Sequence, residues 1–362
     1  MIVFMVNIIS LENYNQSEMQ LEQKKPQNII DKGEFLKAKP ITPKDDAFHG
    51  RFTYLDIEWW YFDAVLEDGY SVHVGVRTYH SKLGGVVKTR IEMYKDGKII
   101  VGAKKFYLFN VFKTSKIFPL IKINDKKIVD FDNDYYNKTG KWIYNVKHKI
   151  NRNEINLEFS GTTPGWKIET DDTCWTVALP KATVNGSIKL NGKKMEVKGV
   201  GYHDHNWRYS PTTALNNLGW FWGRITADSL SFAWANTIAT EKKHQLLSIV
   251  NQDNNSNFFS IKPQNITFIP LKIVRDHRCW IPTEFNLSFK KLDENNIIPV
   301  EVDINMKTFD IHYDRIFTIQ YWRYHVYTNG YIKVGSKTEK LENKPQIIEF
   351  LSFKKHKKNL FK

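Results

Sequence analysis

The residues with the greatest chemical potential in this 362-residue sequence are five consecutive ones near its middle, at positions 203–207. They are His203, Asp204, His205, Asn206 and Trp207. Imidazole and carboxyl groups exchange protons near neutral pH when their surroundings adjust their pKa values, and a neighbouring indole excludes water. The run predicts an acid–base site. The alternative is a buried polar network that fixes how two domains meet.

The spacing within this run divides it into two faces. His203, His205 and Trp207 would share one face of an extended strand, because side chains alternate along a strand. Asp204 and Asn206 would share the other face. Two histidines at i and i+2 can ligate a metal, but the sequence offers no third ligand at a typical spacing. No metal site is therefore predicted.

A second stretch, at positions 58–63, resembles the first in its density of reactive groups and reads Glu58-Trp59-Trp60-Tyr61-Phe62-Asp63. On a strand, Glu58 would share its face with Trp60 and Phe62. Burial between these rings would raise the pKa of the Glu58 carboxyl and make it a candidate acid. The alternative is a structural role, in which Glu58 pairs with an arginine inside a barrel.

Several common reaction classes lack their motifs here. The sequence contains no phosphate-binding glycine loop, no His-Glu-x-x-His zinc motif and no Gly-x-Ser-x-Gly nucleophile elbow. Nucleotide-dependent enzymes and serine hydrolases are therefore disfavoured, and no cofactor is expected.

The elements that position these stretches are short strands. Strand-like runs recur every 8–12 residues or so, which is typical of an antiparallel sandwich or barrel. Aromatic residues make up 14% of the chain, and these favour strands. Expected turns between strands are Asp68-Gly69, Asp96-Gly97, Asn185-Gly186, Asn191-Gly192 and Asn329-Gly330. No long helical periodicity is present, and one short helix is expected within residues 210–218.

The chain is expected to be all-β, with two antiparallel β-barrels in tandem. The predicted boundaries are a polar leader at 1–48, an N-terminal barrel at 49–210, a C-terminal barrel at 211–355 and a basic tail at 356–362. Cys174 and Cys279 are too few and too distant for a disulfide framework, so buried free thiols are expected.

The charge balance is basic, with 53 Lys and Arg against 39 Asp and Glu. The lysines are scattered over many strands and turns without a nucleic-acid-binding motif, so the charge is interpreted as a solubility feature and no nucleic-acid partner is expected. A weak contact of residues 354–358 with an anionic membrane stays open. The N-terminus lacks signal-peptide features and no run reaches the roughly 18 apolar residues of a membrane span, which predicts a cytoplasmic protein.

Two motifs carry a family resemblance. Residues 58–61 and 201–207 together resemble the carotenoid 1,2-hydratase (hydroxyneurosporene synthase) family and its lipocalin-like relatives, which include kievitone hydratase and fungal decalin-forming cyclases. Residues 220–224, Trp-Phe-Trp-Gly-Arg, also fit the pattern. The resemblance covers about residues 50 to 355. It implies two lipocalin-like (calycin) barrels and an apolar pocket in or between them.

The resemblance also implies a reaction, and the sequence departs from the family pattern at two points. In the hydratases, acid–base side chains protonate a carbon–carbon double bond and water adds to the cation. The family's His and Trp would be His205 and Trp207. The family carries a carboxylate on the strand that follows the Trp-Gly-Arg element, whereas residues 231–236 carry none here, and Arg208 replaces a glycine. Asp204 or Glu58 would then have to serve as the acid.

Two functions follow as hypotheses. The first is an enzyme of hydratase-like lyase or isomerase/cyclase type that acts on an isoprenoid- or polyketide-like molecule, with catalytic residues His205, Asp204 and Glu58. Its predicted pocket residues are Trp59, Trp60, Tyr61, His203, Asn206, Trp207, Trp222 and Arg224. The second is a non-catalytic carrier of a lipophilic ligand. In both, the partner is a lipophilic small molecule, and the sequence leaves the oligomeric state open.

Overall fold

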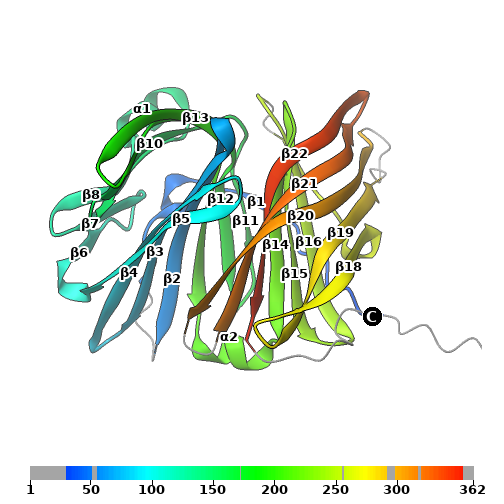
Figure 1. Ribbon diagram of the computed structural model, residues 1–362, viewed down its shortest axis with the longest axis horizontal. Helices are drawn as coiled ribbons and strands as arrows, with labels where there is room; N and C mark the ends of the chain where they lie inside the picture. The colour runs from blue at the N-terminus through cyan, green and yellow to red at the C-terminus, as the bar shows by residue number, and fades with distance from the viewer. Residues whose placement is uncertain are drawn as a thin grey trace, which may run out of the picture.

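The computed structural model describes residues 30–50, 55–171, 173–254, 257–291, 298–316 and 319–353. These residues form two antiparallel β-sheets that stand side by side, each curled into a lipocalin-like barrel (Figure 1). The all-β prediction is confirmed. Most of the predicted leader, residues 1–29, and the basic run at 354–358 lie outside the described residues. Within the described part of the chain, no helix is long and apolar enough to cross a membrane.

The first barrel contains thirteen strands among the described residues, with the order β5-β4-β3-β2-β13-β12-β10-β9-β8-β7-β6. Strand β11 also pairs with β12, and β1 pairs with β11. Their bounds are β1 Lys39–Pro40, β2 Asp56–Leu66, β3 Tyr70–Ser81, β4 Gly84–Lys95, β5 Lys98–Leu108, β6 Phe112–Thr114, β7 Leu120–Ile123, β8 Lys126–Phe131, β9 Ile143–Ile150, β10 Asn153–Gly161, β11 Trp166–Glu169, β12 Cys174–Leu190 and β13 Lys193–Tyr209.

The second barrel contains nine strands among the described residues, in the order β17-β16-β15-β14-β22-β21-β20-β19-β18. Their bounds are β14 Gly219–Thr226, β15 Leu230–Thr240, β16 Lys243–Gln252, β17 Phe258–Ser260, β18 Ile266–Asp276, β19 Cys279–Lys291, β20 Val300–Ile316, β21 Ile319–Val334 and β22 Lys337–Ser352.

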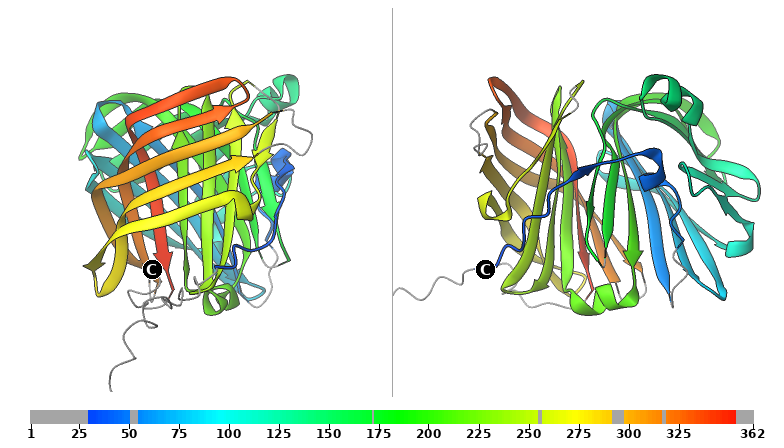
Figure 2. Two further views of the ribbon diagram at one scale, coloured as in Figure 1. Left: turned by 90° about the vertical axis from the view of Figure 1, so that its right-hand side faces the viewer. Right: turned by 180° about the vertical axis from the view of Figure 1, so that it is seen from behind.

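Each barrel encloses its own apolar core, because side chains alternate between the two faces of a strand and one face of each strand points inward. Val72, Val74 and Val76 of β3 lie in the first core, and Phe221 and Ile225 of β14 lie in the second. A third buried layer lies between the barrels. Its members from the two sides include Tyr61, Tyr202, Trp222, Ala233 and Ile347. The outer faces of β2 and β13 are therefore buried against the second barrel. Figure 2 shows the two barrels side by side from two further directions.

Two short α-helices interrupt the strands in the part of the chain that the structure describes. The helix expected within residues 210–218 is present as α2, Pro211–Asn216, which joins the two barrels. A second helix, α1 at Asn133–Thr139, was not expected. It begins at Asp132, whose side chain accepts a hydrogen bond from the Tyr135 backbone N–H, and it ends at Gly140 with a left-handed backbone conformation. The two cysteines are buried free thiols, as predicted.

Residues 30–50 run across both barrels (Figure 2). The backbone of Asp31 forms hydrogen bonds with the backbone of Lys242 and His244 in the second barrel. Further along, β1 pairs with β11 of the first barrel. The segment then enters the first barrel, where Asp46 and Phe48 are buried. This part of the polar leader is thus a component of both barrels.

Two of the predicted turns are wrong. Asn185-Gly186 and Asn329-Gly330 lie inside the long strands β12 and β21. Their glycines have φ values of 140° and 132°. An ideal Cβ on Gly186 would lie 2.2 Å from the Asn156 carbonyl oxygen of the neighbouring strand. Gly186 therefore permits a close approach of two strands. An Asn-Gly dipeptide is compatible with such a close approach as well as with a turn.

Replacing Gly186 by alanine is expected to lower the free energy of unfolding by about 1–3 kcal/mol, because the methyl group would collide with a neighbouring backbone and prefer another φ. Urea unfolding followed by circular dichroism measures the change. The control is Asn185→Ala at the exposed adjacent position, expected to change the same quantity by less than about 0.5 kcal/mol. Equal effects of the two substitutions would contradict the role assigned to Gly186.

Candidate functional site

A cavity of about 320 Å³ lies between the two barrels. It is lined by the outer faces of β2, β3, β4, β12 and β13 on one side and by β14, β15, β16, β21 and β22 on the other. A cavity of this size accepts a small organic molecule. The lining is largely aromatic and aliphatic, and it includes Trp59, Trp175, Trp220, Trp222, Leu247 and Leu351.

The antiparallel register aligns the polar residues of this wall in rows. Asp204 of β13 pairs with Tyr61 of β2, which in turn pairs with Gly75 of β3. The next row joins Asn206, Trp59 and Arg77 in the same way. Each of these residues lines the cavity. The predicted separation of Asp204 and Asn206 from the histidines is confirmed, because His203 and His205 point into the first barrel.

Asp204 is the carboxyl group with the most unusual environment on this wall. It is 5% exposed and lies beside Trp175 and Tyr202. Burial raises the pKa of Asp204 to about 7, although hydrogen bonds from Trp175 and Tyr202 act in the opposite direction. A carboxyl with this pKa is present in both protonation states at neutral pH, as a general acid–base catalyst must be.

The hydrogen bonds of Asp204 indicate where its proton resides. Oδ2 accepts from Trp175 Nε1 at 2.9 Å and from the Tyr202 hydroxyl at 2.8 Å. Within the described part of the chain Oδ1 has one partner, the Asn206 side-chain amide, at 3.0 Å. Since Oδ2 already receives two donors, the neutral acid carries its proton on Oδ1. Asn206 also lines the cavity.

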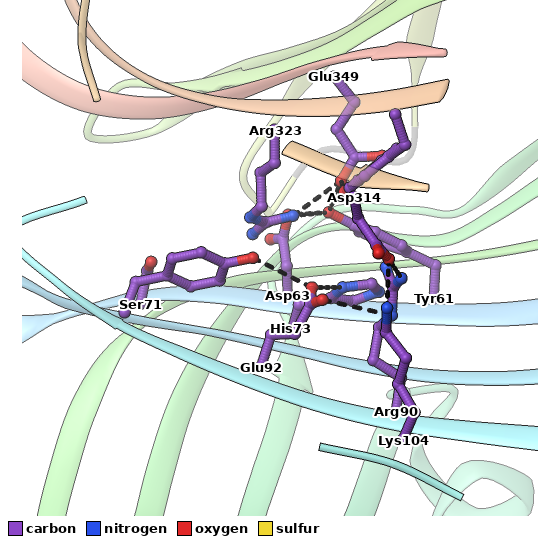
Figure 3. A network of polar contacts seen from close by, with 12 residues as sticks. Tyr61, Asp63, Ser71, His73, Arg90, Glu92, Lys104, Asp314, Arg323 and Glu349 are labelled. Atoms are coloured by element: carbon purple, nitrogen blue, oxygen red, sulfur yellow. Dashed lines mark hydrogen bonds and ion pairs between the residues drawn. The ribbon is translucent and has the colours of Figure 1, made fainter. Parts of the chain in front are cut away.

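A buried cluster of charges joins the two barrels next to the cavity (Figure 3). Asp63 of β2 lies 2.6 Å from Arg224 Nε and 3.7 Å from Arg323 Nη2, both of the second barrel. Arg323 also lies 2.7 Å from Glu349. In the same way Arg90 of β4 pairs with Asp314 of β20. These contacts fix the position of one barrel against the other, and so the shape of the cavity.

Part of this cluster reaches the cavity wall. Glu349 accepts hydrogen bonds from Tyr61 at 2.8 Å and from Tyr321 at 2.6 Å, and all three residues line the cavity. The Arg323 guanidinium donates to Tyr61 at 2.6 Å. Burial and the neighbouring carboxylates hold the pKa of Tyr61 well above its usual value. Tyr61 is therefore a neutral hydroxyl at this wall.

The two histidines belong to a separate network inside the first barrel. His205 lies 2.9 Å from Glu58 Oε1 and 3.4 Å from Asp46 Oδ1. His203 lies 2.9 Å from Asp46 Oδ2, which also accepts from the Tyr144 hydroxyl at 2.6 Å. Against the effect of burial, the two carboxylates raise the pKa of His205 to about 9. His205 is therefore an imidazolium held between two carboxylates.

The structure thus divides the predicted site residues between two places. The predicted residues that line the cavity are Asp204, Trp59, Trp60, Tyr61, Asn206 and Trp222. His205, Glu58, His203 and Trp207 lie in the first barrel and Arg224 lies in the inter-barrel charge cluster, and none of these five lines the cavity. Buried Glu58 forms an ion pair with His205, and not with an arginine as the structural alternative proposed. Among the described residues, no group of three or more His, Cys, Asp or Glu is arranged to hold a metal ion.

The sequence motifs did not identify several residues of the cavity wall and of the polar network inside the first barrel. Asp46 lies in the segment interpreted as a leader, and Glu349 lies near the end of the chain, so neither is close to a motif. Lys88, Arg90 and Glu92 occupy alternate positions of β4. That alternation is a detectable signal for a polar face, but the sequence does not indicate that the face is buried against a second barrel.

Comparisons with known proteins place the fold. No family model matches the sequence. A curated relative, the quinolone epoxide rearrangement protein penF of Penicillium thymicola, is 25% identical over 93 residues, which is 26% of this chain and 25% of that protein. The chain therefore matches about a quarter of the length of this relative.

Solved structures match over most of the chain. A Nitrosomonas europaea protein assigned as AttH has a TM-score of 0.61 at 14% identity, covering 89% of this chain and 99% of its own. CghA in complex with Sch210972 has a TM-score of 0.59 at 9% identity, with coverages of 89% and 95%. Kievitone hydratase from Nectria haematococca has a TM-score of 0.52 at 10% identity, with coverages of 90% and 98%. The chain shares the fold of these proteins.

Proposed function

We propose that the cavity between the barrels binds a lipophilic small molecule and that Asp204 exchanges a proton with it. The reaction class is hydration, cyclisation or isomerisation at a carbon–carbon double bond. The observation that carries the proposal is a carboxyl with a pKa of about 7 on the wall of an aromatic cavity. Asp204 thereby receives the role of the side-chain acid that protonates the substrate in the hydratases that the sequence resembles.

Asp204 alone can serve as both proton donor and proton acceptor in each of these reactions. The double bond takes the proton from Oδ1, which leaves an Asp204 carboxylate and a carbocation. In hydration, water adds to the cation and its surplus proton returns to Asp204. In isomerisation, the proton returns from a carbon next to the cation, and in cyclisation a second double bond attacks the cation first. The rings of Trp59, Trp175 and Trp222 border the same cavity and stabilise positive charge.

His205 and Glu58 receive a positioning role in this proposal. His205 of β13 and Trp60 of β2 stack at 4.3 Å between ring centroids. The His205–Glu58 ion pair holds the same two strands together. Asp204, which adjoins His205 in the chain, thereby keeps its orientation toward the cavity. Direct proton transfer from His205 to a ligand in this cavity is not part of the proposal.

The known proteins of similar fold support the reaction class. One solved relative is a kievitone hydratase, CghA was solved with Sch210972 bound, and the curated relative is an epoxide rearrangement protein. We infer a substrate of the same general type, a hydrophobic secondary metabolite. The carotenoid hydratase reaction is one member of this class.

A carrier is the second candidate, and one observation favours it. The Asp204 oxygens accept three hydrogen bonds from the protein itself, as a purely structural carboxyl would. A carrier would hold its ligand in the same cavity and leave it unchanged.

Native mass spectrometry of protein purified from its own host, followed by extraction of the bound molecule, tests the proposal. An apolar molecule with a double bond that is converted on incubation supports the enzyme. A bound molecule that stays unchanged supports the carrier. Absence of any bound lipophile from the wild-type protein, together with no binding of added apolar probes, would contradict both.

A further inference from the structure

One end of the inter-barrel cavity is strongly cationic. Lys88 and Arg90 of β4 and Arg77 of β3 line it there. Arg77 pairs in register with Lys88, and Gly75 pairs with Arg90, so the three cations project from adjacent positions of the same face. Gly75 lies between Tyr61 and Arg90 in register and lines the cavity, and a Cβ at this position would lie 3.3 Å from His73 Nε2.

The neighbouring charges are already matched among themselves. Four carboxylates, Asp63, Glu92, Asp314 and Glu349, pair with four cations, Arg90, Lys104, Arg224 and Arg323. His73 hydrogen-bonds to Glu92, and burial lowers the pKa of His73, so this histidine adds no cation at neutral pH. Within the described residues, no carboxylate forms an ion pair with Lys88 or Arg77.

Lys88 is the more unusual of the two remaining cations. It is 7% exposed, yet no hydrogen-bond acceptor for its ammonium group occurs among the described residues. The group lies 5.9 Å from the centroid of the Phe106 ring. The residue is mostly buried, but its Nζ is not among the polar atoms sealed from solvent, so a molecule in the cavity can reach the ammonium group. A mostly buried cation without a protein partner is destabilising unless water or a ligand supplies one. The Arg77 guanidinium lies 4.9 Å from the centroid of the Trp59 ring, which holds the cation at the cavity wall.

We propose that Lys88 and Arg77 form an anion-binding end of this cavity, and that its ligand is an amphiphile with one acidic group, such as a carboxylate or an acidic enol, attached to an apolar body. The inference rests on the proposed function, since it assigns a ligand class to the same cavity.

The electrostatic state of Lys88 agrees with this assignment. Burial, followed by the repulsion of Arg90 and Arg77, lowers the pKa of Lys88 to about 7. An anion beside the amine reverses these effects and restores its positive charge. The lysine therefore gains its full charge only when an acidic ligand is present, which favours anions over neutral molecules of the same shape.

The fold also sets the length of the ligand. Strands β4 and β13 are separated by β3 and β2, so three strand spacings lie between Lys88 and the cavity-facing residues Asn206 and Asp204 of β13. Three spacings correspond to about 14 Å between strand axes. The acidic group of the ligand and the atom that meets Asp204 are thus at opposite ends of an extended molecule.

Two fluorescent probes that share one ring system test the proposal. 8-Anilinonaphthalene-1-sulfonate is an anion, and N-phenyl-1-naphthylamine lacks its sulfonate and is neutral. Lys88→Met is expected to weaken binding of the sulfonate probe by about ten- to a hundredfold, the value of one charge-assisted contact. Binding of the neutral probe should change by less than about twofold. The control is Lys98→Met, an exposed lysine of the same barrel, which should leave both affinities unchanged.

Arg77→Gln provides a second, independent variant with the same expected selectivity. Gly75→Val should weaken both probes, because the added side chain takes up space at the cavity wall. Equal weakening of both probes by Lys88→Met, or no effect on either, would overturn the inference. If neither probe binds the wild-type protein, the cavity is not a lipophile site and the proposed function fails with it. If the neutral probe binds but Lys88→Met does not discriminate, only the anionic ligand class is wrong.

Discussion

Replacement of Asp204 by asparagine is expected to lower kcat for the converted ligand by about 10²- to 10⁴-fold, the usual contribution of a positioned general acid. Asparagine keeps the size of the side chain and an oxygen that accepts from Trp175 or Tyr202. It replaces Oδ1, the oxygen assigned the transferable proton, by an amide nitrogen that cannot accept the hydrogen bond from the Asn206 side chain. Ligand affinity, measured by titration, should stay within about threefold of the wild-type value.

The pH profile distinguishes an acid from a structural carboxyl. Burial raises the pKa of Asp204 to about 7, so the proton needed for catalysis is present below that pH and is lost above it. We expect kcat/KM of the wild-type protein to fall above pH 7 and this limb to disappear in Asp204→Asn. The control is Asp228→Asn, which removes a carboxylate whose side chain is 93% exposed. Unchanged turnover by Asp204→Asn would exclude the acid role.

Replacement of Asp46 by alanine is expected to lower the free energy of unfolding by about 3–5 kcal/mol, the cost of breaking a buried ion pair from one side. Asp46 is fully buried and contacts His203, His205 and Tyr144 at once. Its loss leaves three polar groups without this acceptor. Urea unfolding at pH 7 measures the effect.

The adjacent residue supplies a matched control. Asp45→Ala removes a half-buried carboxylate that pairs with Lys167 and accepts from Thr42. A loss of about 1 kcal/mol is expected there, as for other capping side chains. Similar losses for both variants would contradict the central position assigned to Asp46.

The pH dependence of the wild-type stability follows from the same network. Against the effect of burial, the neighbouring histidines hold the pKa of Asp46 well below its usual range, so its contribution is present above about pH 4 and is lost as the pH falls further. The carboxylates outweigh burial and raise the pKa of His205 to about 9, so its contribution is complete below about pH 6.5 and is lost as the pH rises through 9. In an Asp46→Asn variant the alkaline loss should shrink, because His205 keeps only one of its two carboxylates.

The local pattern of the fold is readable in the order of the residues. The period of two along residues 58–63 and 203–207 assigns Glu58 and Trp59 to opposite faces of one strand, and His205 and Asp204 to opposite faces of another. Turn signals such as Asp68-Gly69 mark the hairpins, and Pro211 marks the short helix α2. These features could be predicted because alternation and backbone preference depend on near neighbours in the chain.

Which of these faces meets the inter-barrel cavity depends on the docking of the two barrels. The inward face of β13 places His203 and His205 in a packed barrel, whereas its outward face places Asp204 in the cavity. An outward face normally meets solvent, and only the second barrel converts it into a buried wall. Asp46 contacts His203, although the two residues are 157 positions apart in the sequence. The register across four strands brings Lys88 into one cavity with Asp204. Such contacts depend on chain topology and on the packing of two sheets, and strand periodicity carries no information about either.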